Sequence, residues 1–115
     1  MSASEEILAR YAQVEHEVDA FGRKITVKRL PMDVRIRVIG FCEGEGDLAK
    51  SIIVTAASVR AIDDNPITPP RKREDVDAVV RALDEEGLAA AGIAFRRIHG
   101  IAEIAPEDAI DAAKN

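Results

Sequence analysis

The chain is poor in aromatic residues. It has no tryptophan, one tyrosine and three phenylalanines, so aromatics make up only 3% of its 115 residues. A buried core must therefore be built from Ala, Val, Ile and Leu. Hydrophobic residues reach 47% and charged residues 32%, a balance that is typical of a folded globular protein and excludes a largely disordered chain. The length suits one domain.

Cysteine is almost absent. The single residue, Cys42, has no partner for an internal disulfide, so a fold held by disulfides is excluded and the cytoplasm is the expected compartment. The first residues lack a basic stretch followed by an apolar run, so no signal peptide is expected. Apolar runs also fall far short of the roughly 20 residues that cross a bilayer, which argues against a membrane partner.

Catalytic and metal-binding motifs are lacking as well. His16 and His99 are the only histidines, and no Cys/His cluster has the spacing of metal ligands. Asp63-Asp64-Asn65 is typical of a turn and lacks the spaced acidic pattern of a calcium loop. No glycine-rich phosphate loop follows a predicted strand. We therefore expect no cofactor, no metal and no enzymatic activity.

Positive charge is in deficit. The net charge of −5 argues against nucleic acid as a partner, because phosphate contacts dominate that kind of affinity. Two basic runs point the other way, Arg71-Lys72-Arg73 and Arg96-Arg97, although Glu74 and Asp75 neutralise much of the first. A small nucleic-acid-binding regulator that uses Arg71-Lys72-Arg73 remains the alternative hypothesis.

Residues 14–30 show the alternation of an antiparallel β-hairpin. A turn at Phe21-Gly22 would place Val18 opposite Ile25 and His16 opposite Val27. The same register would place Asp19 opposite Lys24 and Glu15 opposite Lys28, so that acid faces base. Arg29 continues the face of Ile25 and Val27. Because Phe-Gly is not a preferred two-residue turn, a wider loop is left open.

Helical periodicity dominates the rest of the chain. A short helix is expected over 2–12, and four more over about 32–42, 48–62, 74–84 and 88–99, with Gly87 separating the last two. The segment 48–62 is apolar nearly all round, which predicts a central helix. The predicted fold is therefore α+β and mainly α: an N-terminal antiparallel β-hairpin followed by a bundle of about four helices. It forms one domain over 1–100, and the tail 101–115 either holds a short helix from Pro106 or is disordered.

These helices carry abundant apolar surface, which has two interpretations. They can simply pack on each other, or one face can stay open for a partner helix or for self-association. Under the second interpretation the partner-binding residues are apolar side chains of the helices 48–62, 74–84 and 88–99. They are Ile52, Ile53, Ala56, Val59, Val76, Val79, Val80, Leu83 and Phe95.

Three segments carry a more specific pattern: DAFGRKITVKRL at 19–30, TAASVRAIDDNPITPP at 55–70 and REDVDAVVRALDEEGLAAAGIAF at 73–95. Together they resemble the small tail assembly chaperones of long-tailed bacteriophages and prophages, over most of the chain from about Val14 to Phe95. One departure is Asp64-Asn65, where that family's pattern suggests a glycine-containing tight turn.

This resemblance implies a non-enzymatic role in the cytoplasm of a bacterial host. The protein would bind the tape measure protein, keep it soluble and help recruit subunits of the major tail tube protein, and it would be absent from the finished virion. A homo-oligomer is also expected. An amphipathic client helix lying in a groove between helices would suit the apolar faces described above.

Overall fold

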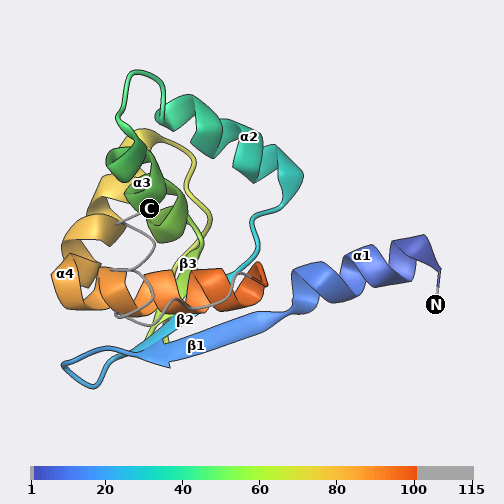
Figure 1. The fold of residues 1–115 in the computed structure, drawn as a ribbon, viewed down its shortest axis with the longest axis horizontal. Coiled ribbons are helices and arrows are strands. Elements are labelled where there is room, and N and C mark those ends of the chain that lie inside the picture. Colours follow the sequence, from blue (N-terminus) through green and yellow to red (C-terminus); the bar gives the residue numbers. More distant parts are fainter. Residues whose placement is uncertain (1, 101–115) are drawn as a thin grey trace, which may run out of the picture.

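The computed structural model describes residues 2–100, and the predicted tail 101–115 lies outside that range. The described part contains four helices and a four-stranded sheet (Figure 1). In chain order the elements are α1 (Ala3–Ala12), β1 (Val14–Val18), β2 (Lys24–Lys28), α2 (Met32–Phe41), α3 (Asp47–Ala57), β3 (Val59–Ile62), β4 (Asn65–Pro66) and α4 (Arg73–Ile98).

The sheet is antiparallel throughout, in the order β1-β2-β3-β4. Helix α4 packs against β1, β2 and α3, and α2 packs against α3. Helix α1 projects from this body as an arm (Figure 1). The α+β class is confirmed, and the predicted hairpin is present as β1 and β2. The arrangement of a hairpin followed by a helical bundle is only partly matched, because the sheet has four strands and the helices are interleaved with them.

The core is aliphatic, as the composition predicted. Ile25 and Val27 of β2, Val59 of β3, and Val76 and Leu83 of α4 are all fully buried. Helices α3 and α4 contribute five buried alanines to this core. They are Ala56 and Ala57 of α3 and Ala90, Ala91 and Ala94 of α4, each at most 3% exposed. No aromatic residue in the described range belongs to the fully buried set. Cys42 belongs to the same core cluster and is 7% exposed, as a small apolar side chain would be.

The predicted helix 48–62 is too long. Helix α3 ends at Ala57, and Val59–Ile62 forms β3 instead, paired with β2. Ser58 marks the change, because its hydroxyl donates to the Val54 carbonyl 2.9 Å away and completes the last helical turn. A short, partly apolar segment such as Val59–Ile62 can form either a strand or the end of a buried helix. Here, pairing with β2 makes it a strand.

The predicted hairpin register is wrong by one residue. Val18 lies opposite Lys24 and Glu17 opposite Ile25. The turn holds three residues, with Gly22 at φ +82°, and the backbone N–H of Asp19 donates to the Arg23 carbonyl at 2.9 Å. The shift turns Val14 and Val18 outward, where they are 40% and 59% exposed.

Helix α4 is kinked where two helices were predicted. The break falls at Asp84, whose φ of +57° and ψ of −166° are not helical, rather than at Gly87. Gly87 lies inside the second half, fully packed. A Cβ there would meet the Leu83 Cβ at 2.9 Å, so the site accepts only glycine without movement.

Candidate partner-binding groove and cationic pocket

The structure divides the predicted partner-binding residues into two groups. Five of them are at most 3% exposed and belong to the chain's own core, so they are not available to a partner in this conformation: Ile53, Ala56, Val59, Val76 and Leu83. The other four are half-buried: Ile52, Val79, Val80 and Phe95. Val59 lies on β3 and not on a helix, and the buried members of α3 and α4 face the sheet and each other in the core.

Ile52 and Phe95 come together in a groove between α3 and the second half of α4. The groove has a volume of about 500 Å³. Its walls are Ser51, Ile52, Thr55, Leu88, Ala89, Gly92, Ile93, Phe95 and Arg96. Gly92 and Ala89 keep the floor low, because they have little or no side chain, and Ile52, Leu88 and Ile93 make the walls apolar. The arrangement can receive apolar side chains from an amphipathic partner helix.

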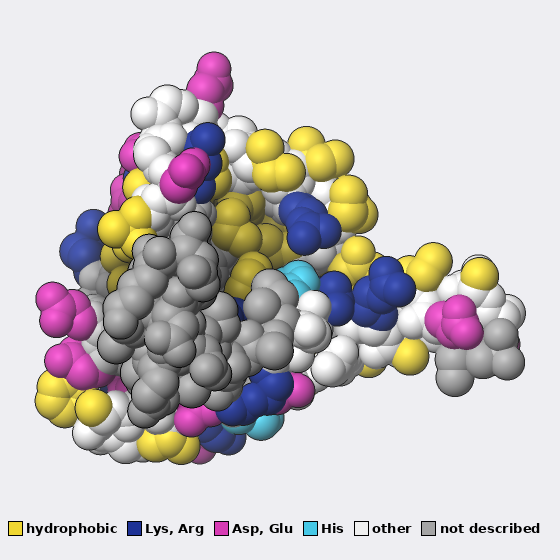
Figure 2. All heavy atoms as spheres, viewed as in Figure 1, with side chains coloured by type: hydrophobic (Ala, Val, Ile, Leu, Met, Phe, Trp, Pro, Cys, Tyr) yellow, Lys and Arg dark blue, Asp and Glu magenta, His cyan; other side chains and the backbone are white. Residues whose placement is uncertain are grey.

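A second apolar surface, on α1 and α2, escaped the sequence prediction. Met32, Ile36 and Ile39 of α2 recur at i, i+4 and i+7, and each is more than half exposed. On the arm, Ile7 is 49% and Leu8 70% exposed, and α1 has no buried residue. Figure 2 shows hydrophobic side chains gathered over α2 and along the arm. The spacing of Met32, Ile36 and Ile39 is visible in the sequence, but only the fold shows which stripe of α2 stays open.

The basic runs are partly engaged within the molecule. Arg73 pairs with Glu45 at 3.3 Å and with Asp77 at 3.1 Å. Arg97 pairs with Glu17 at 2.8 Å. Their charges are therefore shared with carboxylates, which makes Arg71-Lys72-Arg73 and Arg96-Arg97 weaker phosphate sites than their sequence suggests.

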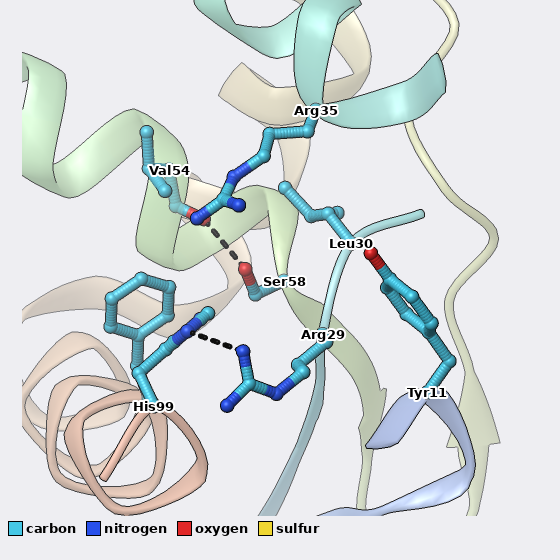
Figure 3. Close-up of a pocket in the computed structure, with 8 residues that line it drawn as sticks. Tyr11, Arg29, Leu30, Arg35, Val54, Ser58 and His99 are labelled. Atoms are coloured by element: carbon cyan, nitrogen blue, oxygen red, sulfur yellow. Dashed lines mark hydrogen bonds between the residues drawn. The ribbon is translucent and has the colours of Figure 1, made fainter. Parts of the chain in front are cut away.

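A pocket lined by cationic side chains lies where α1, the end of β2, α2, α3 and the end of α4 meet (Figure 3). Its volume is about 20 Å³, room for roughly one water-sized group. Its lining consists of Tyr11, Arg29, Leu30, Arg35, Val54, Ser58, Phe95 and His99. In Figure 3, Arg35 reaches down from α2 toward the space that Arg29 and His99 approach from below.

The hydrogen bonds of this pocket define the state of His99. Arg29 donates from Nη2 to the Ile98 carbonyl at 2.9 Å, and its Nη1 lies 3.2 Å from Nδ1 of His99. A guanidinium can only donate, so Nδ1 is the acceptor and the neutral ring carries its proton on Nε2. Burial lowers the pKa of His99 below its usual 6.5, and the charges of Arg29 and Arg35 lower it further.

This pocket has donors in excess of acceptors. Among residues 2–100, no Asp or Glu lines it. Nε of Arg29 is buried without a hydrogen-bond partner among the described residues, which costs about 1–3 kcal/mol for such a group. The alternation of residues along the second strand predicted that Arg29 faces inward with Ile25 and Val27. This alternation was the feature of the sequence that pointed to the pocket.

The structure shows no candidate metal site in its described part. Residues 2–100 contain no group of three or more His, Cys, Asp or Glu side chains able to hold a metal ion.

Comparisons with family models, with curated proteins and with solved structures find no match to the chain. In the described range no helix combines the length and the apolarity that crossing a bilayer requires.

Proposed function

We propose that the protein is a tail assembly chaperone of the long-tailed bacteriophage type, acting in the bacterial cytoplasm. It binds the tape measure protein, keeps it soluble and helps recruit subunits of the major tail tube protein. The observation that carries the proposal is the groove between α3 and α4, whose walls include Ile52, Leu88 and Ile93. The sequence resemblance from about Val14 to Phe95 gives that groove a client that is long and largely helical.

The proposed binding mode is a helix in a groove. A client helix would place side chains at i, i+3 or i+4 between Ile52 on α3 and Ile93 on α4, and burial of these side chains would supply the affinity. Arg96 at the rim of the groove is exposed and suits an acidic residue on the client's polar edge. The low aromatic content leaves a binding surface of flexible aliphatic side chains, which can fit several stretches of a repetitive helical client.

Co-expression tests this function directly. The chain and the tape measure protein encoded at the same locus are produced together and separately, and the soluble fraction of the client is measured. A clear increase in soluble client, with the two proteins co-purifying, supports the proposal. An insoluble client in both cases overturns it, as does salt-sensitive binding of the chain to DNA or RNA without any effect on the client.

Self-association is the second part of the proposal. An isolated helix shorter than about 12–15 residues is marginal in water, so the 10-residue α1 gains stability only from packing. We infer that a second copy supplies the packing surface, the stripe of Met32, Ile36 and Ile39 on α2.

A further inference from the structure

We propose that the pocket between Arg29, Arg35 and His99 is a binding site for a single carboxylate group. Three donor-bearing side chains line it, and among residues 2–100 no Asp or Glu does: Arg29, Arg35 and His99, whose Nε2 carries the proton because Nδ1 faces Nη1 of Arg29. Within residues 2–100, the guanidinium of Arg35 has no ion pair or hydrogen bond, and only its backbone N–H is engaged, with the Pro31 carbonyl. The site is therefore prepared for an anion that the described chain does not supply.

Size and shape select a carboxylate. A volume of about 20 Å³ admits one oxygen atom, while the second oxygen stays at the mouth beside the exposed Arg35. A tetrahedral phosphate is bulkier than a planar carboxylate and fits a space of this size less well. Leu30, Val54 and Phe95 form apolar walls around the donors, and such surroundings strengthen a charge-assisted hydrogen bond.

The pocket adjoins the groove between α3 and α4, since Phe95 lines both. An acidic side chain on a helix in that groove is thus one source of the carboxylate, and this part of the inference rests on the proposed function. A free small carboxylate is another source. Residues 101–115 are a third, because they contain Glu103, Glu107, Asp108 and Asp111.

The test is a titration of the isotopically labelled full-length chain with sodium acetate, followed by NMR at the His99 ring and at the Nε–H of Arg29. Sodium chloride at equal ionic strength is the reference. Saturable shifts of both groups with acetate alone support the site. Shifts that are absent, or equal with chloride, overturn it, and tighter binding of inorganic phosphate overturns the choice of carboxylate.

Two variants distinguish binding of acetate at this pocket from a general effect of the protein's positive charges. Arg35→Gln should weaken acetate binding by about tenfold, the order expected for one charge-assisted hydrogen bond, and Arg35 is exposed enough for the variant to fold. Arg81→Gln removes the same charge from an exposed position of α4 and should change the affinity less than twofold. Equal losses in both variants would overturn the proposal.

The source is then identified by two further comparisons. An amphipathic helical peptide with one Glu should bind more tightly than the same peptide with Gln if the carboxylate belongs to a client. Equal binding of the two peptides overturns a client carboxylate while the acetate site stands. In the second comparison, Glu103, Glu107, Asp108 and Asp111 are changed to the corresponding amides. If the affinity for acetate then rises several-fold, the carboxylate comes from the chain itself, and the proposal of an external carboxylate is overturned.

Discussion

The guanidinium of Arg23 donates a hydrogen bond to the carbonyl oxygen of Leu83, 2.6 Å away and 60 positions further along the chain. A second bond of 2.7 Å reaches the Ala82 carbonyl, and Nε pairs with the buried carboxylate of Asp19 at 2.7 Å. The kink at Asp84 leaves the last carbonyls of the first half of α4 without helical partners. Arg23 satisfies them and thereby joins the hairpin turn to the kink.

Replacing Arg23 by Gln should therefore destabilise the whole domain. We expect the free energy of unfolding to fall by about 2 kcal/mol, because hydrogen bonds from a charged group contribute about 1.5–3 kcal/mol. Urea denaturation followed by circular dichroism measures the change. Arg81→Gln, an exposed substitution on the same helix, should stay within about 0.5 kcal/mol. Similar values for the two variants would contradict the joining role of Arg23.

Two glycines of α4 should respond in opposite directions to alanine. At Gly87 a Cβ meets the Leu83 Cβ at 2.9 Å, an atom fixed by its own backbone, so Gly87→Ala should destabilise by about 1–3 kcal/mol. At Gly92 the nearest atom is 3.7 Å away, so Gly92→Ala should be neutral or stabilise by up to about 1 kcal/mol. Thermal melting of both variants checks the pair, and a stabilised Gly87→Ala would refute the packing described here.

The hairpin shows how far the sequence could predict the fold. Alternation identified both strands and the turn region, and the inward parity of Ile25 and Val27 is correct. The register depended on the loop, and three loop residues in place of two move every pair by one. The deciding contacts are local hydrogen bonds, from the N–H groups of Phe21 and Arg23 to the Asp19 carboxylate at 2.9 Å. Side-chain patterning carries little information about them.

The sequence predicted only part of the candidate groove, for a related reason. Periodicity marks apolar positions, but it cannot distinguish an apolar residue that is covered by the chain from one that is open. Ile53 and Ile52 are neighbours of the same type, yet Ile53 is 3% exposed and Ile52 lines the groove. The difference arises from where α4 crosses α3, which is a long-range property. The cationic pocket likewise assembles residues from five separate segments.

Stability should depend on pH through His99. Because the folded pKa lies below 6.5, the unfolded chain takes up a proton first as the pH falls. The contribution of neutral His99 is thus fully present above pH 6.5 and is lost as the pH falls from there through the folded pKa. His99→Gln, which keeps an acceptor for Arg29, should lose less stability over that window. An NMR titration that gives His99 a pKa above 6.5 would refute the argument.

The arm should control self-association. Leu8→Lys places a charge in the middle of α1, where we expect contact with α2 of a second copy, and it should shift the protein toward monomer. Phe21→Lys is the matched control, because Phe21 is 72% and Leu8 70% exposed, but Phe21 lies in the hairpin turn away from the arm. Light scattering after size-exclusion chromatography measures the mass. A monomeric parent protein, or an equal shift in the control, would count against arm exchange.

Client binding should depend on Ile52 and not on its neighbour Leu48. Both lie on α3, but Ile52 lines the groove and Leu48 is 77% exposed outside it. Ile52→Lys puts a charge where an apolar client side chain would be buried, and losing that burial removes about 1.5–3 kcal/mol of binding, a tenfold or greater loss of affinity. Co-expression with the tape measure protein should then yield less soluble client for Ile52→Lys than for Leu48→Lys. If Leu48→Lys is the more damaging of the two, the client lies on the outer face of α3 and the groove is not its site.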